Sequence, residues 1–170
     1  MTQTPLTERL DPTRGYGDEP APLLGRGAIT AAFFTTAAVA AVTGRRAGVR
    51  IPERIKGRDL AMIGVATYKL ARLVAKDRVT TFVRAPFTEY QHPSGHGEVE
   101  ERPRGTGLRR AVGELVVCPF CLDFWIASGF VAGLTAWPRQ TRLVAAVFDV
   151  LAISDALQLI DRAAQDGLSS

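Results

Sequence analysis

The only two cysteines of this 170-residue chain lie three residues apart, in the segment "LVVCPFCLDFW" (Leu115–Trp125). Pro119 suits the first position of a helix, which would place Cys118 at the N-cap and Cys121 one turn inside on the same face. The unpaired amides and the dipole of a helix N-terminus stabilise a thiolate. Three interpretations stay open: a dithiol redox pair, half of a metal site, or two side chains that cap and pack a helix entrance.

Zinc is the one cofactor that the sequence suggests, and none is required. A CxxC pair supplies two of the four ligands of a tetrahedral zinc site. His92 and His96 are the only histidines, and their H-x3-H spacing in the preceding segment would allow them to supply the other two. A site shared between two chains would instead use the cysteines of each.

A second group of chemically capable residues lies within apolar segments. Lys69 and Arg72 stand three apart on one face of a predicted helix, and Asp149 and Asp155 interrupt the last apolar segment. Charges inside a membrane are costly unless they are paired or hydrated. We therefore expect these four residues to form an intramembrane charge network, which would serve either as a structural ion pair or in ion and proton handling. The alternative is that the carboxylates simply lie near the membrane interface.

The elements that must position these residues are hydrophobic helices. The segment Gly27–Gly44 contains no charge, and Leu115–Pro138 contains only Asp123. Both are long enough to cross a hydrocarbon core about 30 Å thick at about 1.5 Å of rise per residue. The sequence predicts an all-α membrane protein with three or four hydrophobic helices. We expect a disordered polar tail (1–26), a first hydrophobic helix (27–44), a membrane domain (59–161) and a second tail (162–170).

Within the membrane domain, the pattern predicts a helix over 59–78, an interfacial elbow and loop over 79–114, and a C-terminal helical hairpin over 118–161. Whether residues 59–76 cross the membrane or lie at its surface stays open. Gly129 and Gly133 form a GxxxG pair that permits close helix approach, so we expect a homo-oligomer or a membrane-protein partner.

The distribution of charge favours a lipid bilayer over nucleic acid as a partner. The net charge is +4, and the cations gather beside apolar runs, as in "RRAGVRIPERIKGR" (Arg45–Arg58). Such clusters suit an anionic lipid surface. Counts of Lys and Arg on either side of the predicted helices place the loop before Cys118 in the cytosol, in a multi-pass protein of the bacterial inner (plasma) membrane.

No catalytic constellation is evident, so a non-catalytic scaffold or interaction protein is the leading interpretation. The alternatives are a membrane thiol protein, redox or metal-binding, that uses Cys118 and Cys121, and a transport accessory that uses the intramembrane carboxylates.

Two segments, "TYKLARLVAKDRVTTFVRAPF" (Thr67–Phe87) and "GELVVCPFCLDFW" (Gly113–Trp125), resemble the bacterial membrane proteins of the domain of unknown function 1360 family. The resemblance covers about residues 60–160 and implies an integral membrane protein without an established activity. Asp123 departs from the pattern, because a small residue is expected there. We also expect Arg84 to lie near Glu114 at the mouth of the cysteine helix. Besides Arg72 and the cysteines, the resemblance marks Asp77, Arg78, Arg84, Pro86, Glu114 and Trp125.

Overall fold

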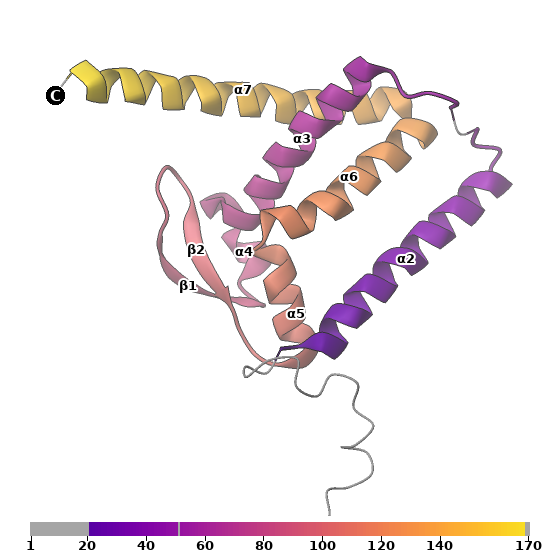
Figure 1. The fold of residues 1–170 in the computed structure, drawn as a ribbon, viewed down its shortest axis with the longest axis horizontal. Coiled ribbons are helices and arrows are strands. Elements are labelled where there is room, and N and C mark those ends of the chain that lie inside the picture. The colour runs from indigo at the N-terminus through magenta and orange to yellow at the C-terminus, as the bar shows by residue number, and fades with distance from the viewer. Residues whose placement is uncertain (1–20, 51, 169–170) are drawn as a thin grey trace, which may run out of the picture.

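Helices make up most of the chain in the computed structural model, which describes residues 21–50 and 52–168 (Figure 1). The helices are α2 (Leu23–Arg46), α3 (Gly57–Lys76), α4 (Thr81–Arg84), α5 (Gly107–Val116), α6 (Pro119–Ala136) and α7 (Pro138–Leu168), and a 3-10 turn (Arg78–Thr80) precedes α4. Two antiparallel strands, β1 (Thr88–Pro93) and β2 (Val99–Pro103), form a hairpin. The predicted all-α architecture with a C-terminal helical hairpin is confirmed, and the two short strands are a minor addition.

Three of the described helices are long and apolar enough to cross a membrane: α2, α6 and the segment Pro138–Gly167 of α7. Their outward side chains are largely hydrophobic. Phe34 on α2 and Leu143 on α7 are 63% and 71% exposed, respectively. Helix α3 has comparable length, at 20 residues, but carries charges at both ends and in its second half.

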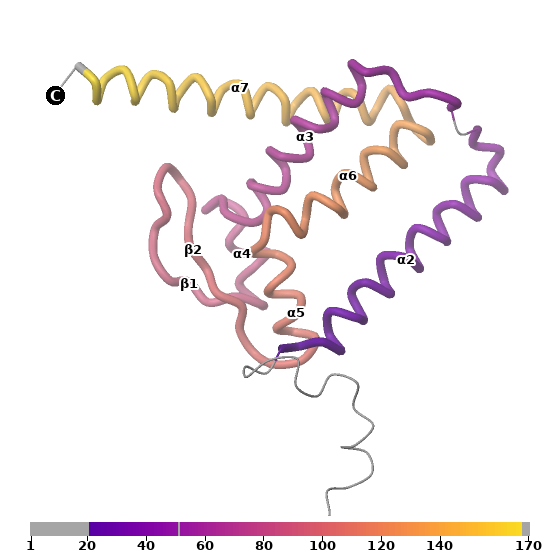
Figure 2. The backbone as a smooth tube through the Cα atoms, viewed as in Figure 1, coloured from indigo at the N-terminus to yellow at the C-terminus, as the bar shows by residue number. Residues whose placement is uncertain are grey.

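The core lies where α3 packs against α6 and α7. Near its start, Ile63 of α3 packs with Leu134 near the end of α6. Near its end, Ala71 and Ala75 pack with Leu122 at the start of α6. Helices α3 and α6 therefore run antiparallel (Figure 2). The small alanine side chains favour a close approach of the two helices.

Helix α2 meets the rest of the molecule along a short contact with α5 and α6. A Cβ atom added to Gly25 would lie 2.7 Å from Cβ of Ala111 in α5, so glycine is needed at this crossing. Further along α2, the ring of Phe33 lies 4.3 Å from that of Phe124 and 4.9 Å from that of Trp125, centroid to centroid. Residue numbers rise together on both sides of this contact, and α2 runs in the same direction as α6 (Figure 1).

The predicted elbow and loop over 79–114 contains more regular structure than expected. The stretch over 79–83 forms helical turns, because the side chain of Asp77 accepts a hydrogen bond of 3.0 Å from the backbone N–H of Val79. The hairpin reverses at Gly95 and Gly97, whose φ values of 80° and 83° favour glycine. Helix α5 follows the hairpin, and its residues Ala111 and Gly113 are buried.

The helical segments also extend beyond the predicted limits. Helix α7 continues to Leu168 through residues expected to form a tail, and α2 begins at Leu23, inside the predicted N-terminal tail. Residues 1–20 of that tail lie outside the described residues. The last turns of α7 extend past the other helices (Figure 1).

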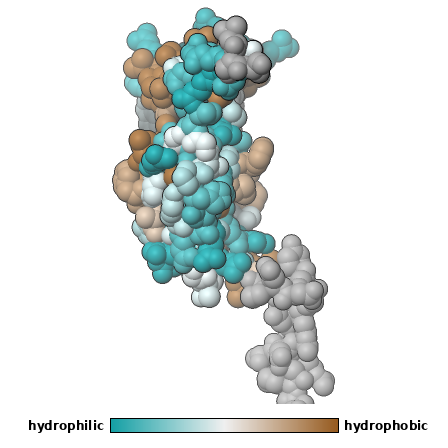
Figure 3. All heavy atoms as spheres, turned by 90° about the vertical axis from the view of Figure 1, so that its left-hand side faces the viewer, coloured by the Kyte–Doolittle hydropathy of each residue, from teal (hydrophilic) through white to brown (hydrophobic). Residues whose placement is uncertain are grey.

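The face that carries the hairpin is hydrophilic over its middle and flanked by apolar residues (Figure 3). The hairpin contributes Glu89 and Arg102, which form an exposed ion pair at 2.7 Å. The flanking helices contribute exposed apolar side chains, among them Leu157 and Ile160 of α7. Polar and apolar surfaces are thus separated between different elements of the fold.

Candidate functional site

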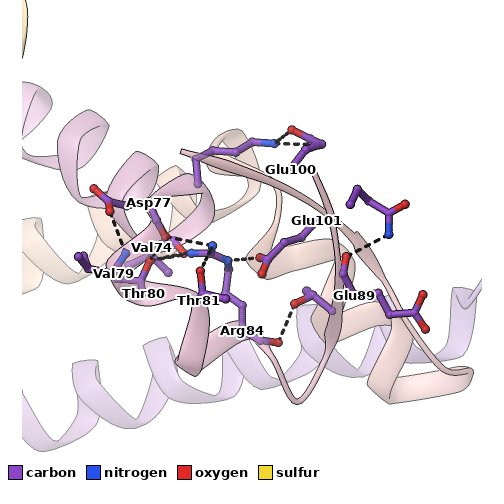
Figure 4. Close-up of polar contacts among 12 residues, drawn as sticks. Val74, Asp77, Val79, Thr80, Thr81, Arg84, Glu89, Glu100 and Glu101 are labelled. Carbon is purple, nitrogen blue, oxygen red and sulfur yellow. Dashed lines mark hydrogen bonds and ion pairs between the residues drawn. The ribbon is translucent and has the colours of Figure 1, made fainter. Parts of the chain in front are cut away.

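Arg84, the last residue of α4, is the largest fully buried side chain of the described residues. Its Nε pairs with the carboxylate of Glu101 in β2, whose side chain is also buried. Nη1 donates to the carbonyl of Val74 and to Oγ1 of Thr80, both at 2.6 Å. Nη2 donates to the carbonyl of Asp77 at 3.1 Å (Figure 4). Arg84 therefore ties together the end of α3, the 3-10 turn and the hairpin.

The guanidinium of Arg84 has no donor left for a ligand. Arginine carries five N–H donors, and a further contact of 3.4 Å from Nη2 to Oγ1 of Thr81 completes the set. A buried ion pair is stable only when its remaining hydrogen-bonding groups are satisfied, as they are here. We therefore regard Arg84 and Glu101 as the structural centre of a polar module comprising α4, the hairpin and α5.

Four charged residues of α3 have a partner of opposite charge on another element. Lys69 pairs with Asp155 of α7, so the structure brings together two members of the predicted charge network. At the other end of α3, Asp59 accepts hydrogen bonds of 3.1 Å and 2.7 Å from Arg142 of α7. These two pairs fasten α3 to α7.

Arg72 and Lys76 of α3 bind the hairpin instead of α7. Nη2 of Arg72 lies 2.5 Å from Glu98, and Nζ of Lys76 lies 2.8 Å from Glu100. The predicted pairing of Arg72 with an aspartate of α7 is thus not present. Asp149 is not joined to the network, because its buried Oδ1 has no hydrogen-bond partner in the described part of the chain.

The acidic partners of Arg72 and Lys76, in β2 and the segment before it, are not among the predicted site residues, although their spacing is a usable signal. Arg72 and Lys76 are four residues apart and lie on one face of α3. Glu98 and Glu100 are two residues apart and point to one side of an extended chain. The distances along a helical turn and along two strand residues are similar, so the two pairs form side by side.

Glu114 and Arg84 do not meet, which corrects the expected pairing. Glu114 binds Arg26 of α2 at 2.8 Å and Arg110 of its own helix at 3.4 Å. Of the two arginines that bind Glu114, one belongs to α2, which precedes the region of family resemblance. Of the other marked positions, Asp77 and Arg78 form the turn after α3, and Pro86 supplies its carbonyl to Nε of Arg109 at 2.9 Å.

The cysteine pair stands at the start of α6, as the sequence predicts. Cys118 is the N-cap, Pro119 is the first helical residue, and Sγ of Cys118 accepts a hydrogen bond of 3.2 Å from the N–H of Cys121. The two residues are joined by a disulfide, with Cα atoms 5.2 Å apart. Phe120 between them is 85% exposed. The pair therefore sits at an accessible helix entrance beside the polar module.

The histidines do not join the cysteines. His92 lies in β1, where its Nδ1 contacts the carbonyl of Pro93, and His96 in the hairpin turn contacts Arg162 of α7. Within residues 21–50 and 52–168, no three His, Cys, Asp or Glu side chains form a group suited to a metal ion. The four-ligand zinc arrangement is thus absent from the described residues.

The two glycines of the GxxxG pair have different surroundings. A Cβ on Gly133 would lie 2.7 Å from Oγ1 of Thr141 in α7, so this glycine serves the contact between α6 and α7. Gly129 has no neighbour within 4 Å of such a Cβ. Trp125 contributes its ring to the contact with Phe33.

The region from α3 to α7 is similar to known proteins. The family model described as protein of unknown function (DUF1360) matches residues 62–161. The sporulation protein YjcA of Bacillus subtilis (strain 168) is 28% identical over 91 residues, which cover 52% of this chain and 77% of that protein. No solved structure matches the chain. The matched region contains the Arg84 centre and the cysteine pair, and it excludes α2.

Proposed function

The chain belongs to the DUF1360 family, and we propose from that premise that it is a multi-pass protein of the bacterial inner (plasma) membrane that acts as a non-catalytic scaffold. The observation that carries this proposal is the outward apolar surface of α2, α6 and α7. Soluble monomers rarely expose apolar patches larger than a few hundred Å². Lipid is the environment that covers three such helices at once.

The direction of the helices supports four crossings, with α3 as the second. Helices α2 and α6 run in the same direction (Figure 1), with Gly25 near the start of α2 beside Ala111 of α5 and Phe33 further along α2 beside Phe124 of α6. The chain must return across the membrane between two parallel crossings. Helix α3 runs antiparallel to α6, and its 20 residues span about 30 Å. The pairing of Lys69 with Asp155 removes an unpaired charge from this crossing.

In this topology, the polar module, the cysteine pair and the end of α7 lie on one side. Eleven Lys and Arg residues fall on that side and eight on the other, leaving out Lys69 and Arg72. The excess favours a cytosolic position for the module. A scaffold role fits the module, because the donors of Arg84 are all engaged in holding its elements together. A homo-oligomer or a membrane-protein partner belongs to this proposal, with Gly129 at the open part of α6.

Labelling of single cysteines in intact cells tests the location and the topology. In a Cys118→Ser, Cys121→Ser background, we expect Ala47→Cys to react with an impermeant maleimide from outside. Ser94→Cys and Ala164→Cys should react only after lysis. Protection of Ala47→Cys together with Ser94→Cys would instead place α3 at the membrane surface, and the reverse pattern would invert the orientation. Recovery of the chain in the soluble fraction after a carbonate wash would overturn the proposal.

The disulfide favours a second candidate function, a membrane thiol protein. Reduction of the Cys118–Cys121 bond by a dithiol protein would transfer two electrons and two protons, leaving two thiols here and a disulfide on the reductant. The N-terminal position on α6 favours the thiolate that such exchange requires.

Differential alkylation across a series of glutathione ratios tests this second function. We expect the pair to pass reversibly from two thiols to one disulfide within the range of cellular ratios of reduced to oxidised glutathione. Mass spectrometry of the peptide that contains both cysteines measures the change. The Cys121→Ser variant serves as control, because it leaves one thiol without its partner. A pair that keeps one state over the whole range would rule out reversible exchange and leave the scaffold proposal intact.

A further inference from the structure

A basic cavity lies at the end of the bundle opposite the polar module. It has a volume of about 270 Å³ and opens between the connection from α2 to α3 and the start of α7. Its cationic lining consists of Arg50, Arg54, Lys56 and Arg142. Asp59 is the one carboxylate among the lining residues. Four cations thus face a single anion across a small cavity.

The one carboxylate of the cavity is already neutralised. Both oxygens of Asp59 accept hydrogen bonds from the guanidinium of Arg142, at 3.1 Å and 2.7 Å. This two-point contact fixes both side chains where the cavity begins. Arg50, Arg54 and Lys56 therefore supply an uncompensated charge of about +3 at the cavity, at neutral pH. A ligand that satisfies them must be anionic.

The walls of the cavity also contain apolar side chains. Ile55 and Leu134 line it together with Pro138, the first residue of α7. Leu134 belongs to the core between α3 and α6, so the apolar part of the lining continues into the bundle. A group that combines a negative charge with an adjoining hydrocarbon chain would match both parts. The volume lies just below the roughly 300–1,000 Å³ of pockets for drug-sized ligands, which suits a headgroup.

We propose that this cavity binds the phosphate headgroup of an anionic phospholipid. Guanidinium groups match the geometry of phosphate oxygens, and clusters of Lys and Arg attract acidic headgroups. The inference rests on the proposed membrane location, because the lipid must reach the cavity from the bilayer. The bound headgroup would join the connection before α3 to the start of α7 and so reinforce the pair between Asp59 and Arg142.

Thermal unfolding of the delipidated full chain in neutral detergent tests the proposal. We expect phosphatidylglycerol in mixed micelles to raise the unfolding midpoint in a saturable way, and phosphatidylcholine to leave it unchanged. The double variant Arg54→Gln, Lys56→Gln should weaken the affinity for phosphatidylglycerol by about tenfold or more. Both side chains are exposed, so the variant should keep the unfolding midpoint of the lipid-free chain.

The matched control is Arg45→Gln, Arg46→Gln, which removes the same charge from the end of α2 outside the cavity lining. We expect this control to change the affinity by less than about threefold. An equal loss of affinity for phosphatidylglycerol in both double variants would show that the lipid is attracted by the general surface charge and would overturn the proposal. The same saturable rise with inorganic phosphate alone would make free phosphate the ligand and overturn the lipid source.

The absence of any midpoint shift with either ligand would also overturn the proposed cavity function. This outcome is distinct from failure of the membrane location, which is read from the carbonate wash. A chain that stays in the membrane without a lipid-dependent midpoint would keep the scaffold proposal and lose the headgroup site.

Discussion

Replacing Arg84 with alanine is expected to lower the free energy of unfolding by about 3–5 kcal/mol, as is typical when one partner of a buried ion pair is removed. Glu101 would remain buried without its cation, and the carbonyls of Val74 and Asp77 would each lose a donor. Chemical or thermal unfolding of the purified protein in detergent measures the change.

The exposed pair between Arg102 and Glu89 provides the control. Its side chains are 67% and 43% exposed, so Arg102→Ala should cost less than about 1 kcal/mol. The double variant Arg84→Met, Glu101→Leu should be more stable than Arg84→Ala, because it leaves no buried charge unpaired. If Arg84→Ala proved as mild as Arg102→Ala, the Arg84 centre would not hold the polar module together.

The second large effect is expected at Gly113, in α5. A Cβ at this position would lie 2.5 Å from the carbonyl oxygen of Phe87 and 3.0 Å from Cβ of Pro103. The Phe87 oxygen belongs to the backbone and cannot rotate away, so α5 must shift from the hairpin. We expect Gly113→Ala to destabilise the protein by about 1–3 kcal/mol, the usual range for an overpacked site. The unfolding midpoint reports this loss.

Gly129→Ala is the matched control, since Gly129 is also helical but has no neighbour within 4 Å of the added Cβ. Alanine favours a helix over glycine by roughly 1 kcal/mol, so this variant should be neutral or more stable. Opposite signs at the two glycines would attribute the loss at Gly113 to the close approach of the hairpin. A similar change in both variants would contradict that explanation.

The long helices were predictable because their signal is local. An uncharged run such as Gly27–Gly44 determines the helix wherever the rest of the chain lies, and α2 spans it. The hairpin was not predictable in the same way, because only a few of its side chains, among them Thr88 and Val99, are buried. Its β-strand pattern is hidden by charges, among them Glu100 and Glu101, whose partners lie on α3 and α4.

The identity of the charge partners depended on how the elements cross. Arg84 meets Glu101 because the strands pair Tyr90 with Glu101, and this register is not visible in the sequence. Asp149 and Asp155 are six residues apart on α7, so at about 100° per residue they point in different directions. Only one of them can face Lys69, and the crossing of α3 over α7 selects Asp155.

The two pairs that fasten α3 to α7 also impose an order on biosynthesis. Asp59 and Lys69 leave the ribosome 83 and 86 residues before Arg142 and Asp155, respectively. At about 5–20 residues per second, translation supplies these partners roughly 4–17 s later. If α3 crosses the membrane as proposed, its charges must wait that long in the insertion machinery or at the lipid surface. Stable insertion of α3 would then be completed only when α7 arrives.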